Sequence, residues 1–97
     1  MIERIEGGLR VTAAMVIANA RPLLEAGRSG LRAGHATDLL RVDLAGVGEV
    51  DSSALGVVFA WLRTAAERSQ ALRIVNPPAS LISLAALYGV SELLPLA

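Results

Sequence analysis

Short runs of branched aliphatic residues alternate along this chain with segments whose apolar residues recur at helical spacing. These two periodicities predict four strands and three helices in the order β-β-α-β-α-β-α. The strands are predicted over residues 2–5, 9–12, 39–44 and 71–75, and the helices over about 19–31, over 53–68, and from Pro78 to Tyr88. Such alternation is typical of an α/β sheet whose parallel strands are joined by right-handed crossover helices.

Composition limits the chain to one small domain, residues 1–97, and excludes several classes of function. Hydrophobic residues make up 54% of the sequence but include only three aromatics, so we expect a core of small aliphatic side chains. The absence of cysteine excludes disulfides and thiolate metal sites. The nine arginines are scattered and balanced by nine acidic residues, which is untypical of a nucleic-acid groove or a polybasic membrane patch.

The distribution of charged and apolar residues along the chain predicts where in the cell the protein is located. The first six residues carry acidic charge and no apolar run, and no stretch approaches the roughly 18 apolar residues of a membrane span. We therefore expect a cytoplasmic protein without direct membrane insertion, peripheral to the inner membrane only through a partner complex. A net charge of zero does little to oppose self-association, which leaves a homodimer of the isolated chain open.

Polar residues gather where a glycine-containing loop leads into the predicted helix 53–68. Asp51, Ser52 and Ser53 can accept hydrogen bonds from the unpaired N–H groups of a first helical turn, at about 0.5–2 kcal/mol for one good cap. Capping alone is one interpretation. The other is that a hydroxyl here is a docking contact or a phosphorylation site, where backbone N–H groups would hold a phosphate that adds roughly −1.5 to −2 charges.

The helix 53–68 carries two apolar groups on different faces. The first is the predicted core stripe, formed by Leu55, Val58, Phe59, Leu62 and Ala66. The second group lies off that face, starts beside the serines, and consists of Ala54, Val57 and Trp61. Trp61 either packs sideways under a neighbouring helix or anchors a partner, since tryptophan is enriched at interface hot spots. The proximity of this group to the serines favours a binding surface.

The last predicted helix ends in a recognisable way. Leu81, Leu84, Ala85 and Tyr88 have the spacing of a core stripe, and Gly89 is expected to stop the helix in a Schellman ending, with Val90 making its hydrophobic contact.

The strand end Asp43-Leu44, the glycine-containing loop and the run Val50-Asp51-Ser52-Ser53-Ala54-Leu55-Gly56 resemble the signature of STAS domains. That family includes anti-sigma-factor antagonists and the cytoplasmic tails of sulphate transporters. The resemblance covers nearly the whole chain and implies a mixed four- to five-stranded sheet with helices packed mainly on one face. Ala54 stands where glycine is usual, and its methyl group would limit the closest approach of a partner backbone.

Two branches of the family assign different roles to the two serines. In the antagonists the phosphorylated hydroxyl follows Asp-Ser, which corresponds to Ser53, and the partner is an anti-sigma factor kinase. The run Leu84 to Val90 resembles instead the small, MlaB-like STAS subunit of Mla-type phospholipid ABC transporters, which binds the ATPase subunit. There the hydroxyl directly after the aspartate, Ser52, belongs to the contact region. This segment favours the transporter branch, with Ser52 or Ser53 still open as a phosphorylation site.

The expected protein is therefore a non-catalytic partner-binding module without a metal or cofactor. His35 is the single histidine and is predicted in a solvated loop, and no nucleophile–base pair or phosphate-binding loop is visible. The resemblance and the second apolar group together predict one partner surface, formed by Asp51, Ser52, Ser53, Ala54, Val57, Trp61, Leu87 and Tyr88.

Overall fold

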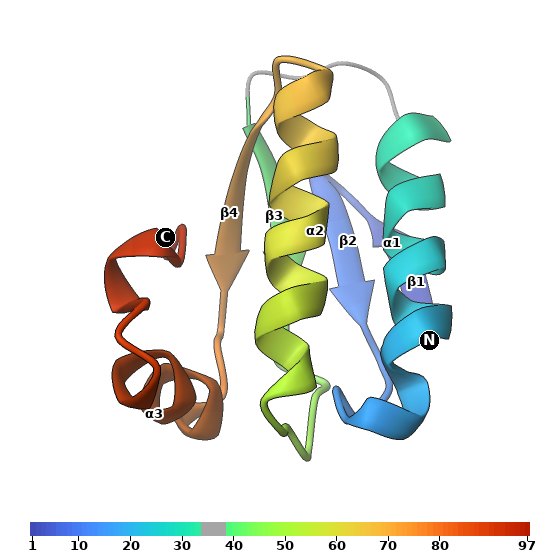
Figure 1. The fold of residues 1–97 in the computed structure, drawn as a ribbon. Coiled ribbons are helices and arrows are strands. Elements are labelled where there is room, and N and C mark those ends of the chain that lie inside the picture. The colour runs from blue at the N-terminus through green and yellow to red at the C-terminus, as the bar shows by residue number, and fades with distance from the viewer. Residues whose placement is uncertain (34–38) are drawn as a thin grey trace.

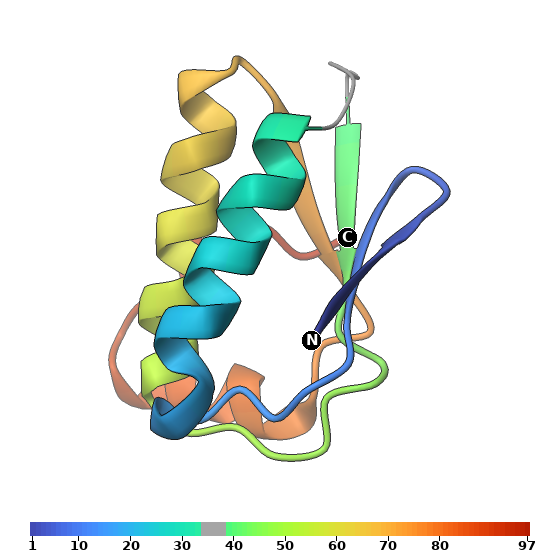
Figure 2. The same cartoon turned by 90° about the vertical axis from the view of Figure 1, so that its right-hand side faces the viewer.

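The computed structural model describes residues 1–33 and 39–97 and shows one sheet with helices packed against it (Figures 1 and 2). Its elements are β1 (Ile2–Ile5), β2 (Gly8–Val11), the 3-10 turn η1 (Ile17–Asn19), α1 (Ala20–Ala33), β3 (Leu39–Asp43), α2 (Ser53–Glu67), β4 (Ala71–Val75), α3 (Ala79–Leu87) and the 3-10 turn η2 (Ser91–Leu93). His35, predicted in a loop, lies outside the described residues.

The sheet has the strand order β1-β2-β3-β4. The hairpin strands β1 and β2 pair antiparallel, whereas β2 pairs with β3 and β3 with β4 in parallel. Beyond β4, a single parallel bridge joins Ile74 to Leu96, so the chain end begins a fifth row. The predicted fold class and order of elements are confirmed.

One face of the sheet forms the floor of the core. Side chains alternate along the strands, and in β2, β3 and β4 those on this face are buried: Leu9, Val11, Leu40, Val42, Leu72 and Ile74. Figure 2 shows α1 and α2 side by side over this face and no helix over the other. The expectation that the helices pack mainly on one face is therefore confirmed.

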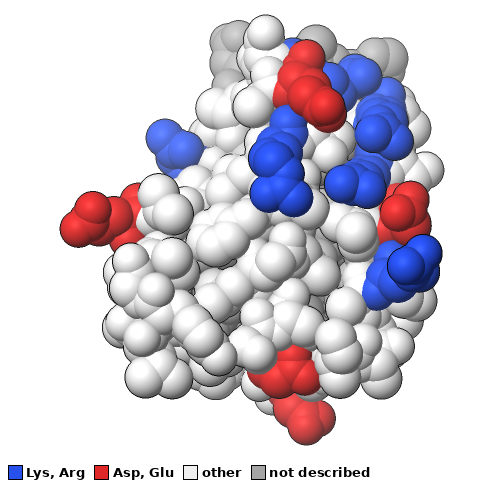
Figure 3. All heavy atoms as spheres, viewed as in Figure 1, with Lys and Arg blue, Asp and Glu red and all other residues white. Residues whose placement is uncertain are grey.

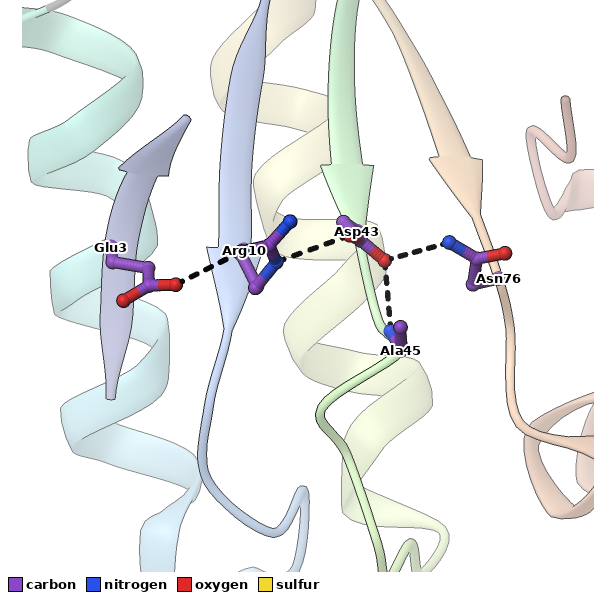
Figure 4. A network of polar contacts seen from close by, with 5 residues as sticks. All are labelled: Glu3, Arg10, Asp43, Ala45 and Asn76. Atoms are coloured by element: carbon purple, nitrogen blue, oxygen red, sulfur yellow. Dashed lines mark hydrogen bonds and ion pairs between the residues drawn. The ribbon is translucent and has the colours of Figure 1, made fainter. Parts of the chain in front are cut away.

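The open face of the sheet carries a polar network centred on Asp43 (Figure 4). The Asp43 carboxylate accepts hydrogen bonds from Nδ2 of Asn76 at 3.0 Å, from the N–H of Ala45 at 2.9 Å and from Nε of Arg10 at 3.2 Å. Arg10 also reaches Glu3 at 3.3 Å. The bonds from Asn76 and Ala45, with Arg10 adding to them, hold the pKa of Asp43 below its usual range. This buried carboxylate thus links β3 to β2 and to the residue that follows β4.

The predicted core stripe of α2 needs correction. Leu55 and Val58 are buried, but Ala66 is exposed, while Ala54, Val57 and Trp61 of the second apolar group lie in the core. The reason is the position of α2, which packs against α1, α3 and the sheet (Figure 1). A helix with three neighbours buries most of its circumference, so no single stripe describes its core.

None of the helices in the described part of the chain combines the length and apolarity required to cross a bilayer.

Candidate functional site

The start of α2 is held by one carboxylate. Asp51 accepts hydrogen bonds from the N–H of Ser53 at 2.9 Å and from the N–H of Ile17 at 2.8 Å, and the hydroxyl of Ser53 also donates to it. Ser52 makes no capping hydrogen bond, and its side chain is exposed. Capping therefore belongs to Asp51, and the Ser52 hydroxyl remains accessible at the surface.

The same hydrogen bonds shift the titration of Asp51. The donated bond from the Ser53 hydroxyl, followed by that from the Ile17 N–H, lowers the pKa of Asp51. An unfolded aspartate, with a pKa of about 3.9, takes up its proton first as the pH falls. The stabilisation is therefore fully present above about pH 4 and is lost as the pH falls through the lower pKa of the folded state.

We accordingly expect the free energy of unfolding to decline below about pH 4 and the Asp51→Asn variant to decline less steeply. Urea unfolding at several values between pH 7 and pH 3 measures this dependence. Glu49→Gln, which replaces an exposed carboxylate two residues away, is the control. An equally steep decline in Asp51→Asn and the unmodified chain would show that this carboxylate does not contribute.

The two serines line different recesses on either side of α2. Ser53 lies in a hollow between α1 and α2, here called the α1–α2 hollow, which is lined by Ala20, Arg21, Leu24, Glu25, Ser53, Gly56 and Val57. Ser52 and Tyr88 both line two adjoining recesses on the other side. Together these form the α2–α3 groove, lined by Val50, Asp51, Ser52, Leu55, Phe59, Ser80, Ser83, Leu84, Leu87, Tyr88 and Val90.

The end of α3 supplies the most exposed apolar side chains of the groove. Leu87 is 77% exposed and Tyr88 is 59% exposed. The N–H of Gly89 donates to the carbonyl of Ala86, and the N–H of Val90 to that of Ala85, which is the predicted Schellman ending. Gly89 has a φ of +70°, so the chain reverses there and leaves Tyr88 outside the core. The expectation that Tyr88 continues the core stripe of α3 is wrong.

Trp61 does not belong to this surface. Its side chain is only 2% exposed, its Nε1 donates to the carbonyl of Leu24 at 3.3 Å, and it packs over Gly27 of α1. The interpretation of Trp61 as a partner-facing anchor is therefore wrong, and the sideways packing under a neighbouring helix is correct. Ala54 and Val57, also predicted on the partner surface, are 0% and 5% exposed.

The structure thus reorganises the predicted partner surface. It brings Ser52 together with Leu87 and Tyr88, which are distant from it in the sequence, and it turns Ser53 towards α1. Phe59 and Leu84, which the sequence predicts in the core, are half-buried and line the groove. Helical spacing could not reveal this role, because it depends on where α3 meets α2.

Charge is distributed unevenly over the helical side of the molecule (Figure 3). Arginines gather over the upper part of α1 and α2 in this view, whereas a wide area over α3 and the middle of the molecule is uncharged and acidic side chains appear at the lower edge. Within the described ranges, no group of three or more histidine, aspartate or glutamate side chains is placed to hold a metal ion. The groove is therefore a largely apolar surface edged by hydroxyl groups and by the carboxylate of Asp51.

Comparison with known proteins shows what the chain is similar to. The family model described as "Mlab, STAS domain" matches residues 2–95. Among solved structures, a candidate anti-sigma factor antagonist from Thermotoga maritima superposes with a TM-score of 0.75 at 16% sequence identity. The match covers 99% of this chain and 83% of that one, and at this identity it supports the fold. A search of curated proteins found no match.

Proposed function

The chain belongs to the STAS domain family, in its MlaB-like group, and from that premise we propose that it binds the ATPase subunit of a phospholipid-transporting ABC system through the α2–α3 groove. In this proposal it is a non-catalytic cytoplasmic subunit that supports or regulates the ATPase. The observation that carries the proposal is the exposed cluster of Ser52, Leu87 and Tyr88 in one groove.

The exposure of these apolar groups supports an interface. Burying a leucine side chain stabilises a protein by about 1.5–3 kcal/mol. Leu87 remains in water in the isolated chain, so this stabilisation is available to an interface that covers it. Tyrosine provides a large contact area with a polar tip and is enriched at binding hot spots. Ser52 adds a hydroxyl beside them that the helix start does not use. These are the components of an apolar contact with a hydrogen-bonding rim.

The alternative is an anti-sigma-factor antagonist controlled by phosphorylation of Ser53. In its favour, Ser53 shares the α1–α2 hollow with Arg21, which can pair with a phosphate. Against it, the Ser53 hydroxyl is bound to the Asp51 carboxylate, so a phosphate there would face a like charge. The geometry therefore favours the groove on the Ser52 side and the transporter subunit.

We expect Leu87→Asp to weaken binding to the purified ATPase subunit of the organism's phospholipid transporter about 30-fold or more, the loss associated with a hot spot. Leu93→Asp is the matched control, because Leu93 is 61% exposed but does not line the groove. The dissociation constant is measured by titration calorimetry, with circular dichroism to confirm folding.

Equal affinities for Leu87→Asp and Leu93→Asp would show that the groove is not the binding surface. Absence of binding by the unmodified chain, together with the addition of one phosphate at Ser53 by an anti-sigma factor kinase and ATP, would replace this proposal with the alternative. Loss of that added mass in Ser53→Ala identifies the modified hydroxyl.

A further inference from the structure

Gly56, in the first half of α2, is a glycine that its own fold does not require. A Cβ atom added there meets no atom within 4 Å, its φ is not positive, and the residue is exposed. Glycine is a poorer helix former than alanine because it loses more backbone freedom on folding. The chain therefore carries a destabilising residue here without a reason in its own packing or backbone conformation.

Gly56 lies on the outward surface of α2, between the α1–α2 hollow and the α2–α3 groove. Ser52, Gly56, Phe59 and Arg63 follow one another at helical spacing on the outward side of the helix. Gly56 lines the α1–α2 hollow, while Ser52 and Phe59 line the α2–α3 groove. Because Gly56 has no side chain, the helix surface is lower at this position. Packed helices lie 8–10 Å apart depending on the side chains at the contact, so this is where a second helix can approach α2 most closely.

The charges around this crossing point define the partner helix. Arg21 stands at the rim of the α1–α2 hollow, and Arg63 lies two turns along α2 from Gly56. In the described part of the chain neither arginine forms an ion pair, whereas Glu25 is 3.6 Å from Arg28. The α2–α3 groove also contains Asp51, whose carboxylate is already bound by Ile17 and Ser53, and the remaining lining residues are uncharged. A helix complementary to this surface would place an apolar stripe against the α1–α2 hollow and the α2–α3 groove, and acidic residues beside Arg21 and Arg63.

We propose that Gly56 is the point of closest approach for an acidic amphipathic helix of the partner. This helix crosses α2 and places apolar side chains in the α1–α2 hollow and the α2–α3 groove. This inference rests on the proposed function and takes the ATPase subunit as the partner. It assigns a role to the glycine of the Asp-Ser-Ser-Ala-Leu-Gly run that the fold leaves unexplained.

The test is Gly56→Ala, for which stability and binding change in opposite directions. We expect the melting temperature to rise by about 3–6 °C, because alanine is the better helix former. Affinity for the purified ATPase subunit is expected to fall about tenfold, because the methyl group overfills a tight contact. Ser29→Ala, at an exposed position within α1, is the matched control that improves helix propensity away from both recesses.

Charge reversal tests the acidic character of the helix. Arg63→Glu is expected to weaken binding about tenfold and to reduce its dependence on salt. Arg73→Glu, at an exposed position on the opposite, open face of the sheet, leaves affinity unchanged. Equal losses in the two variants would overturn the assignment of an acidic partner helix.

The outcomes separate this inference from the proposed function. If the unmodified chain binds the ATPase subunit and Gly56→Ala binds equally well, the inference is overturned and the proposed function stands. If the unmodified chain does not bind, both are overturned. If sedimentation shows that the chain alone is a dimer that Gly56→Ala dissociates, the occupant is a second copy and the inference is again overturned.

Discussion

Gly27→Ala is expected to lower the free energy of unfolding by about 2–3 kcal/mol, in the upper part of the range of about 1–3 kcal/mol for overpacking a filled core. A Cβ atom at Gly27 would lie 2.0 Å from Nε1 of Trp61, far inside contact distance. The indole is buried and its Nε1 is bonded to the carbonyl of Leu24, so it cannot move aside without losing that bond. Helix α1 must therefore shift away from α2. Urea unfolding measures the effect, and Trp61, the single tryptophan, provides the fluorescence signal.

Gly56→Ala is the matched control for this substitution, because the same change at a helical glycine with open space is expected to stabilise the chain. A double-mutant cycle identifies the clash. In a Trp61→Phe background the smaller ring leaves room at Gly27, so Gly27→Ala should cost much less there, as followed by circular dichroism. If the two substitutions are additive, the contact between Gly27 and Trp61 is not the cause of the loss.

Asp43→Ala is expected to lower the free energy of unfolding by about 2–3 kcal/mol, because it removes the shared acceptor of three partly buried hydrogen bonds. The N–H of Ala45, Nδ2 of Asn76 and Nε of Arg10 all donate to this carboxylate. Asn76 also has a φ of +54°, a left-handed conformation that its hydrogen bond to Asp43 helps to hold. Chemical denaturation at pH 7 gives the difference in stability.

Glu3→Ala is the control within the same network. Glu3 is bonded to Arg10 at 3.3 Å, but its side chain is 55% exposed, and ion pairs at such positions contribute about 1 kcal/mol or less. A loss in Glu3→Ala as large as that in Asp43→Ala would mean that the network acts as one unit and that Asp43 has no special role.

Several features of the fold follow from local interactions and could be predicted. The alternating apolar residues of the strands, the turn at Gly7 with its φ of +78°, and the Schellman ending at Gly89 depend on residues close in the sequence. The polar start of α2 was also predictable, because a first helical turn needs acceptors for its N–H groups. The sequence did not show which of the three polar residues caps the helix. Asp51 also accepts a hydrogen bond from Ile17, 34 residues away, and that contact exists only in the folded chain.

The structure places only some residues of the predicted partner surface side by side at the surface. The resemblance placed Ser52 and the Leu87-Tyr88 region on a partner surface, and the fold brings these residues into one groove. Trp61 was assigned to the same surface because it lies off the expected core stripe of its helix. That argument assumed that α2 has one buried face, whereas α1 lies beside it and encloses the indole over Gly27.

The order of strands and helices, the ends of the elements and the family were determined by the sequence, since they depend on periodicity and on short-range hydrogen bonding. The tertiary structure decided which faces of α2 are buried, which serine faces α3 and which apolar side chains stay in water. Helix α2 is apolar on several sides, so its sequence pattern is compatible with more than one choice of buried face. Only the packing of α1 and α3 against it, through contacts between residues distant in the sequence, selects one.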